Sequence, residues 1–127
     1  MNQDLIERYI YAVTKGLNRR QQEDVALELR RGTLILLVLS QLRQPMYGYS
    51  LVKSLNENGI PMDPNTLYPL MRRLEGQGLL KSHWDTGEAK PRKYYQITEE
   101  GTAVLEKTSA YYKTFSQTVN ALLEGEL

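Results

Sequence analysis

Two arginines and an asparagine share one side of residues 63–76, a segment whose pattern predicts a helix. At about 100° per residue, apolar side chains gather within one arc: Leu67, Leu70, Met71 and Leu74. The other side is polar or slender: Asn65, Pro69, Arg72, Arg73 and Gly76. Arginine can pair with guanine or clamp a phosphate, and asparagine can pair with adenine. This side therefore suits the major groove of DNA, although a plain solvent-exposed helix face has the same composition.

A second group of cations lies in a turn-rich segment further along the chain. Residues 79–84 and 93–97 are short, alternate in polarity like strands, and predict a β-hairpin. The basic side chains lie at its tip: Lys90, Arg92 and Lys93. Such a tip can reach the minor groove of DNA or the phosphates beside it. Asp85 and Glu88 cancel part of the charge, and an ordinary hairpin turn is the alternative interpretation.

The chain offers little for catalysis or metal binding. It has no cysteine, which excludes disulfides, thiol nucleophiles and thiolate metal sites. The one histidine, His83, stands beside Trp84 without the further ligands that a metal site needs, so we interpret it as structural. The segment Gly76-Gln77-Gly78 ends a helix instead of opening one, so it does not predict a phosphate-binding loop. We expect no enzymatic activity, no cofactor and no metal.

A run of helices must position these groups. Apolar periodicity, capping residues and Gly or Pro stops predict helices over residues 4–15, 19–31, 33–43, 47–58 and 63–76. Asn18 is a candidate N-cap for the second helix, and Asp63 or Asn65 for the fifth. After the hairpin, Thr98 caps a last helix of about 25 residues. This order predicts a mainly α fold, a winged helix-turn-helix with a two-stranded wing. We expect an N-terminal helical extension, a DNA-binding domain and a C-terminal dimerisation helix: residues 1–31, 32–97 and 98–127.

Size and charge fit a single domain that binds nucleic acid through a patch. The chain has 127 residues and a formal net charge of +1. Residues 63–97 carry six basic and four acidic side chains, whereas residues 98–127 carry two and five, so an acidic tail masks a mildly basic body. The longest apolar run, Leu34 to Leu39, is too short to span a membrane, and the first residues are not a basic secretory segment. We expect a cytoplasmic protein with no membrane partner.

The last helix carries an apolar stripe with alternating spacings of three and four. This heptad seam predicts a dimer: Leu105, Thr108, Tyr112, Phe115, Val119 and Leu122. Val104, Tyr111 and Leu123 widen the stripe beyond what one small core needs, although packing on the same domain is the alternative. Four aromatic residues could form a pocket for a planar hydrophobic effector, or could simply be core: Trp84, Tyr111, Tyr112 and Phe115.

Several motifs together resemble the PadR family of transcription regulators, over residues 31–123. They occur in the family's order and spacing: Gly48-Tyr49, Thr66-Leu67-Tyr68-Pro69-Leu70, Arg73-Leu74-Glu75, Gly78-Leu79-Leu80, Trp84, Arg92-Lys93-Tyr94-Tyr95 and Ile97-Thr98-x-x-Gly101. The resemblance implies a homodimer, a palindromic operator in double-stranded DNA, repression, and relief by a small molecule or stress signal. The last helix is similar in length to that of the short-tailed subgroup. The extra N-terminal residues depart from the family pattern.

The resemblance also implies roles for matching residues. Tyr68, with Asn65 and Thr66 beside it, would lie at the DNA face, and Tyr49 would contact phosphate. Trp84 would belong to the core or line a pocket at the dimer interface. If Asn65 is the N-cap, Pro69 lies at the end of the first helical turn, where a proline costs less. The candidate DNA-binding set is Tyr49, Asn65, Thr66, Tyr68, Pro69, Arg72, Arg73, Lys90, Arg92 and Lys93.

Three functions compete at this point. The leading hypothesis is a homodimeric repressor that an effector releases from its operator. The second is a protein-interaction module that keeps the winged-helix fold without binding DNA, which the low net charge of +1 slightly favours. The third, a small enzyme, has no catalytic motif to support it.

Overall fold

The computed structural model describes residues 18, 20–21, 29, 31–87 and 89–126. The helix predicted over residues 4–15, and most of that predicted over 19–31, lie outside the described residues. At the start of the second, the Asn18 side chain accepts a hydrogen bond from the Gln21 amide at 2.8 Å. The Gln21 side chain accepts one from the Asn18 amide at 3.1 Å. This reciprocal pair is a capping box, so the prediction of Asn18 as an N-cap is confirmed.

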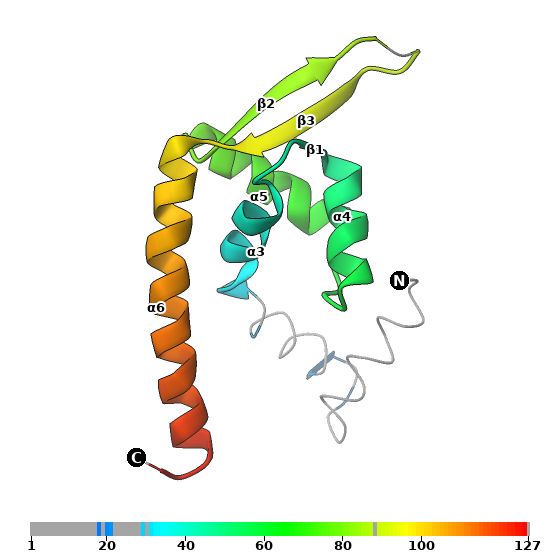
Figure 1. Ribbon diagram of the computed structural model, residues 1–127. Coiled ribbons are helices and arrows are strands. Elements are labelled where there is room, and N and C mark those ends of the chain that lie inside the picture. Colours follow the sequence, from blue (N-terminus) through cyan, green and yellow to red (C-terminus); the bar gives the residue numbers. More distant parts are fainter. Residues whose placement is uncertain (1–17, 19, 22–28, 30, 88, 127) are drawn as a thin grey trace.

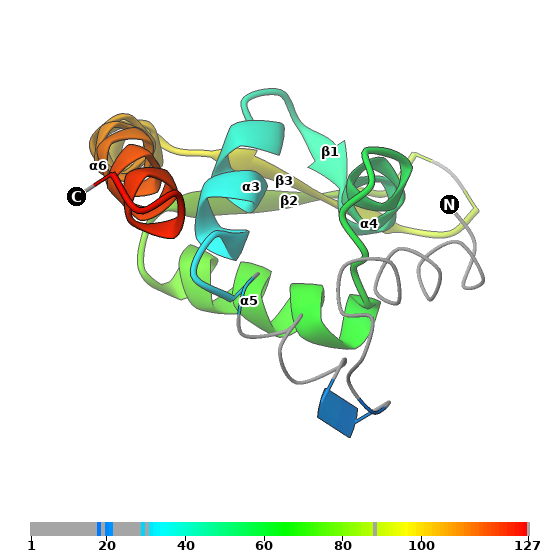
Figure 2. The same ribbon diagram turned by 90° about the horizontal axis from the view of Figure 1, so that it is seen from below.

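Helices α3 (Leu34–Gln41), α4 (Gly48–Glu57) and α5 (Pro64–Gly76) surround the hydrophobic core (Figures 1 and 2). Their bounds lie within two residues of the predicted ones. The fully buried side chains come from all of these helices and from Leu42, the C-cap of α3: Val38, Leu39, Leu42, Leu51, Leu55, Leu67, Met71 and Leu74. Because α3 is apolar on most sides, its remaining leucine and isoleucine residues are half-buried against the same core.

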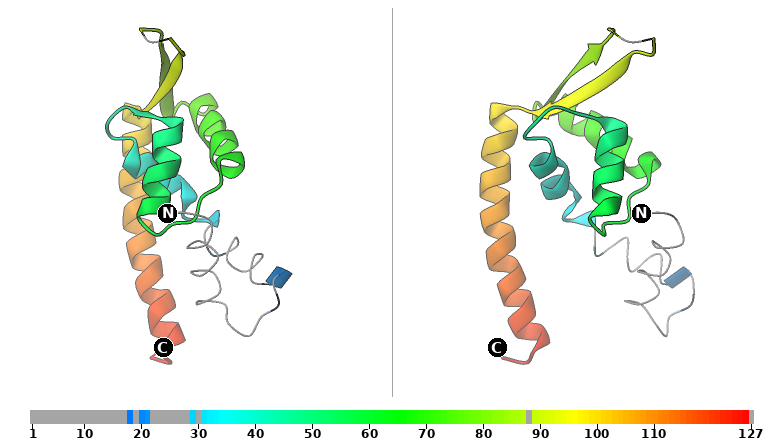
Figure 3. Two further views of the ribbon diagram at one scale, coloured as in Figure 1. Left: turned by 90° about the vertical axis from the view of Figure 1, so that its right-hand side faces the viewer. Right: turned by 45° about the vertical axis from the view of Figure 1, so that its right-hand side comes forward.

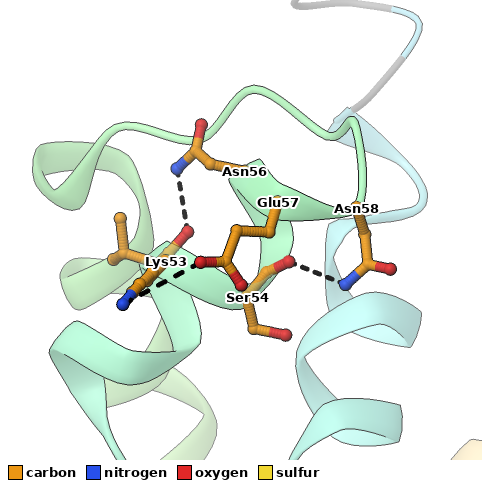
Figure 4. Close-up of polar contacts among 6 residues, drawn as sticks. Lys53, Ser54, Asn56, Glu57 and Asn58 are labelled. Carbon is orange, nitrogen blue, oxygen red and sulfur yellow. Dashed lines mark hydrogen bonds and ion pairs between the residues drawn. The ribbon is translucent and has the colours of Figure 1, made fainter. Parts of the chain in front are cut away.

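The turn between α4 and α5 is held by one buried polar side chain, Asn56. Its amide nitrogen donates to the Val52 carbonyl at 2.8 Å and to the Met62 carbonyl at 3.0 Å. Its side-chain oxygen accepts from the Met62 amide at 3.1 Å. Figure 4 shows Asn56 beside the exposed Lys53–Glu57 ion pair. Asn56 thereby satisfies buried backbone groups of an irregular segment and fixes where α5 begins.

Helix α5 begins at Pro64, with Asp63 as its N-cap. The Asp63 carboxylate accepts a hydrogen bond from the Asn65 amide at 2.8 Å, and Pro64 occupies the first turn, where its missing N–H is harmless. Of the two candidate caps, Asp63 is therefore the one used. Consequently the expectation that Pro69 lies at the end of the first turn is wrong, because Pro69 is inside the helix. A proline there cannot donate to the carbonyl one turn before it.

The strands β1 (Met46–Tyr47), β2 (Leu80–Asp85) and β3 (Arg92–Ile97) form an antiparallel sheet in the order β1-β3-β2 within the described residues. The hairpin of β2 and β3 is the predicted wing: β2 starts and ends one residue later than predicted, and β3 starts one residue earlier. Figure 3 shows it projecting from the helices. The sequence did not predict β1. It pairs Met46 with Tyr95 and Tyr47 with Tyr94, which attaches the wing to the start of α4.

Helix α6 (Glu99–Leu123) starts beside the wing and runs along α3 (Figure 1). The Thr98 hydroxyl accepts from the Gly101 amide at 3.0 Å and donates to the Gly78 carbonyl at 2.6 Å, so the cap also joins α6 to the end of α5. Beyond its first turns, α6 extends past the core (Figures 1 and 3). None of the helices in the described part of the chain has the length and apolarity to cross a membrane.

Candidate nucleic-acid interface

Helix α5 presents its polar side to solvent, as its helical periodicity predicts. Its apolar residues are buried, and Tyr68 is half-buried. The other predicted residues on this helix are exposed: Asn65, Thr66, Pro69, Arg72, Arg73 and Gly76. The two arginines lie on a regular helix, which holds them at fixed positions for a groove.

The start of α4 packs directly against α5 through Gly48 and Tyr68. A Cβ atom on Gly48 would lie 2.6 Å from Cε1 of the Tyr68 ring. Only glycine therefore lets the ring rest against the α4 backbone. Tyr49, the next residue, is 71% exposed. The Gly48–Tyr68 contact thus places Tyr49 and the first half of α5 on one continuous surface.

A groove of about 730 Å³ lies where α4, α5 and the wing meet. It combines aromatic rings with cations: Tyr47, Gly48, Tyr49, Ser50, Tyr68, Trp84, Lys90, Arg92, Lys93 and Tyr95. Five of the predicted DNA-binding residues, from three separate elements, therefore line one hollow. A concave surface with this many positive charges attracts a polyanion such as a nucleic-acid backbone.

The three wing cations differ in their surroundings. Lys90 and Arg92 are exposed. The Lys93 ammonium instead lies 3.5 Å from the Glu75 carboxylate of α5, and 5.2 Å from the centre of the Tyr95 ring. Glu75 also accepts a hydrogen bond from Ser82 of β2. Lys93 thus joins the wing to α5, and Glu75 neutralises part of the charge that the sequence assigned to DNA contact.

Sequence reasoning missed Tyr47. Its ring stacks on that of Tyr94 with centroids 4.0 Å apart. The Tyr94 hydroxyl donates to the Tyr47 hydroxyl at 2.5 Å, and Tyr47 donates to the Asp85 carboxylate at 3.3 Å. The pairing with Tyr94, then loss of solvent, then the Asp85 charge raise the pKa of Tyr47 to about 12. Its position directly before the Gly48-Tyr49 motif was the available signal, but it acquires a role only through its pairing with β3.

Known proteins share this sequence pattern and this fold. The sequence profile of the Transcriptional regulator PadR-like family matches residues 35–107, which is more than half of the chain. The chain belongs to this family. A PadR family transcriptional regulator from Eggerthella lenta is 61% identical, with a TM-score of 0.76 over 80% of this chain and 91% of that one. A PadR-like transcriptional regulator from Bacillus cereus is 31% identical, with a TM-score of 0.70 over 78% of this chain and 99% of that one.

A curated relative is more distant. The transcriptional regulator Rv3488 of Mycobacterium tuberculosis is 37% identical over 60 residues, which cover 47% of this chain and 56% of that protein. This chain therefore spans little more than half the length of that relative. Membership of the PadR family confirms the winged-helix fold and makes the chain a transcriptional regulator, which implies DNA binding. It also confirms the expectation that the chain is not an enzyme, because PadR regulators are non-enzymatic.

The aromatic residues predicted for an effector pocket lie on two distant parts of this PadR chain. Trp84 is on the wing and is 61% exposed, so of its two predicted locations, the core and a pocket at the dimer interface, the core is wrong. Tyr111 and Phe115 stack on each other along α6, with ring centres 5.8 Å apart, and Tyr112 lies beside them. Trp84 lines the groove beside the wing, and the α6 rings come much later in the sequence. The groove that Trp84 lines includes none of the three α6 residues.

The predicted seam of α6 divides into two parts. Leu105 is 4% exposed and belongs to the core of its own domain, so its assignment to a partner helix is wrong. Thr108 is half-buried, and its hydroxyl donates to the Val104 carbonyl within α6. The remaining large apolar side chains of the stripe are exposed: Tyr111, Tyr112, Phe115, Leu122 and Leu123. Val119 lies among them and is half-buried.

The described residues hold no group of three His, Asp or Glu side chains that could bind a metal ion. His83 is exposed on β2, and its ring stacks on Tyr94 with centres 5.2 Å apart.

Proposed function

We propose that this PadR regulator is a homodimeric repressor that reads a palindromic operator with α5 and the wing. The observation that carries the proposal is the continuous surface formed by the exposed side of α5, the start of α4 and the groove beside the wing. Recognition helices of winged-helix proteins enter the major groove, and the flanking contacts fix their register. We also propose that the protein acts in the cytoplasm, where it would meet its operator.

Each part of the surface has its own role in this proposal. Arg72 and Asn65 read base edges in the major groove, while Thr66, Tyr68 and Pro69 allow close approach and Arg73 reaches the backbone. Tyr49 donates its hydroxyl to a phosphate, as polar side chains near a helix start commonly do. Lys90 and Arg92 of the wing contact the adjacent minor groove or its phosphates. Lys93 contributes less, because Glu75 already pairs with it.

The exposed apolar part of α6 supports the homodimer. It leaves five large side chains in water along one helix, and a soluble chain rarely leaves such a stripe uncovered. Burying each one stabilises a complex by about 1.5–3 kcal/mol. A second copy offers the same stripe, and two-fold pairing of identical helices is the commonest oligomer symmetry. Two recognition helices then lie about one DNA turn apart, roughly 34 Å, and match a palindrome.

Release by an effector is the last element of the proposal. Trp84 of one copy and the α6 rings of its partner are planar and exposed, so together they suit a small hydrophobic or aromatic compound. A compound that binds between the copies changes the spacing of the two α5 helices, and so weakens operator binding in proportion to its preference for the altered dimer.

Selection of bound duplexes from a random DNA pool tests the function. We expect an inverted repeat with half-sites one helical turn apart, and affinity that falls steeply with salt. Enrichment of a single unrepeated site would contradict the dimeric arrangement. Failure to enrich any duplex, at low salt and with the folded dimer, would contradict operator binding and favour the protein-interaction module.

A further inference from the structure

We propose that Tyr47 is a positioning residue that holds Arg92 of the wing in place for DNA; the inference rests on the proposed contact between the wing and the operator. Tyr47 lies on β1, next to the start of α4, and the wing reaches it through β3. Three kinds of contact converge on this one side chain: a cation over its ring, a stacked ring beside it, and hydrogen bonds to its hydroxyl.

Arg92 rests on the Tyr47 ring. Its guanidinium carbon lies 5.1 Å from the ring centre, which is the geometry of a cation–π contact. The Tyr47 ring is itself stacked on Tyr94 at 4.0 Å, and Tyr94 stacks on His83 at 5.2 Å. The three stacked rings come from three strands: Tyr47 from β1, Tyr94 from β3 and His83 from β2. The position of the Tyr47 ring beneath Arg92 is therefore fixed by the whole sheet. An arginine held this way keeps its donors turned toward a ligand and loses less freedom on binding.

The Tyr47 hydroxyl controls the carboxylate that would otherwise compete for Arg92. Asp85 is paired with Arg92 across the β2–β3 ladder, and opposite charges in that relation attract. One Asp85 oxygen accepts the Tyr47 hydroxyl at 3.3 Å, and the other accepts the Gly87 amide at 3.0 Å. Tyr94 completes the chain by donating to Tyr47 at 2.5 Å. The Tyr47 ring therefore supports the Arg92 guanidinium, while the Tyr47 hydroxyl donates a hydrogen bond to the Asp85 carboxylate.

The consequence for DNA binding is a wing cation that remains available. Arg92 is exposed and lines the same groove as Tyr49 and Tyr68. If Asp85 paired with Arg92, the charge offered to a phosphate would be neutralised before binding. Because Tyr47 precedes α4 directly, it also fixes Arg92 relative to the surface that α4 and α5 share.

The test is a double-mutant cycle on the selected operator, measured by fluorescence anisotropy at several salt concentrations. Arg92→Ala should weaken binding and lower the magnitude of the salt slope by about 1.8, because the proposed dimer loses one phosphate contact of about 0.9 in each copy. Tyr47→Ala should lower the slope by the same amount, and the double variant should bind no worse than Arg92→Ala alone. Tyr47→Phe keeps the ring and should lose less affinity. Thr118→Val, which removes an exposed hydroxyl on α6, should match the wild type.

A rescue experiment separates positioning from folding. In the Tyr47→Phe background Asp85 is released, so adding Asp85→Asn should restore affinity toward that of the wild type. This comparison also serves if Tyr47→Ala does not fold. Multiplied losses in the double variant, or an unchanged salt slope in Tyr47→Ala with Arg92→Ala impaired, would overturn the positioning role while operator binding stands. A wild-type protein that binds no duplex would instead overturn the proposed function.

Discussion

The Glu75 carboxylate of α5 lies 3.5 Å from the Lys93 ammonium of β3. Because Glu75 also accepts the Ser82 hydroxyl of β2, one acidic side chain joins the last part of α5 to both strands of the wing. The geometry between the recognition helix and the wing therefore depends on a negative charge located beside the exposed cations of both elements. A charge of this sign inside a DNA interface weakens overall attraction and in return fixes the relative position of the two elements.

Glu75→Gln should increase affinity for unrelated duplex DNA several-fold. Lys93 of each copy then becomes available to a phosphate, so the magnitude of the salt slope should rise by up to about 1.8 for the proposed dimer, about 0.9 for each new contact. The loss of the pair, which is about 30% exposed on each side, should cost at most about 1 kcal/mol of unfolding free energy. Titration with a random duplex at several salt concentrations measures the change. The matched control is Glu57→Gln, which breaks the exposed Lys53 pair on α4. Unchanged non-specific affinity in Glu75→Gln would contradict this account of Lys93.

Arg72→Ala and Tyr68→Ala should each remove operator binding while the dimer persists. Arg72 is exposed, so its loss changes contacts with a base or phosphate and not the core. Each lost bidentate contact costs about 1–3 kcal/mol, so the two copies in the proposed dimer together lose roughly thirty-fold to more than ten-thousand-fold in affinity. Gel shift and size-exclusion chromatography measure the two properties. Lys107→Ala, an exposed cation on α6, should bind as the wild type does. Full operator affinity in both interface variants would show that the DNA surface lies elsewhere.

Phe115→Glu should convert the dimer to a monomer at micromolar protein concentration. The phenyl ring is 53% exposed in one chain, and its burial by a partner stabilises the complex by about 1.5–3 kcal/mol per copy. A charge in that position also opposes its symmetry mate. Light scattering coupled to size exclusion gives the mass, and Lys113→Glu, outside the stripe of the same helix, is the control. A Phe115→Glu dimer of unchanged stability would mean that α6 does not form the interface.

Asn56→Ala should destabilise the fold by about 2–3 kcal/mol. The change removes the hydrogen bonds of Asn56 to Val52 and to Met62, and leaves buried backbone groups without partners. Urea unfolding followed by circular dichroism measures the loss. Asn58→Ala provides a comparison, since that exposed amide bonds to the Ser54 carbonyl within α4 and should cost far less. Equal losses in the two variants would refute the structural role of Asn56.

The raised pKa of Tyr47 predicts how stability changes in alkali. The folded state holds the phenolic proton to a pH of about 12, whereas the ordinary value is 10.0. The contribution of the protonated Tyr47 side chain to the free energy of unfolding is therefore complete below pH 10 and disappears as the pH rises through about 12. Across that window the free energy of unfolding should fall more steeply for the wild type than for Tyr47→Phe, with parallel curves below it. Urea titrations at successive pH values measure both curves, and identical slopes would contradict the shift.

The winged-helix fold could be predicted because its signals are local. The apolar arc of Leu67, Leu70, Met71 and Leu74 depends on residues a turn apart, and the caps at Asp63 and Thr98 act within three residues. Strand β1 could not be predicted, since two residues are too short to show alternation. Its partner, Tyr94, lies 47 positions along the chain. Tyr47 was missed for the same reason.

Periodicity also does not reveal what covers an apolar stripe. Leu105 and Phe115 fall on one predicted seam, yet Leu105 packs on its own core and Phe115 is exposed. The sequence shows that both are apolar on the same side, but the core of the domain covers the first of them and not the second. Similarly, Trp84 was a candidate for the core on residue type alone, whereas its position on the wing leaves it exposed.

Helix α6 contains 25 residues and is anchored near its first turns, where Gly101 is buried beside Leu79 and Thr98 bonds to the Gly78 carbonyl. At about 1.5 Å per residue, it is roughly 37 Å long. The helix is therefore a long rigid arm that is fixed to the rest of the domain at one end, beside the wing. In the proposed dimer, a rotation of a few degrees between the two α6 helices would move each α5 helix by ångströms, enough to bring it out of step with the pitch of the duplex.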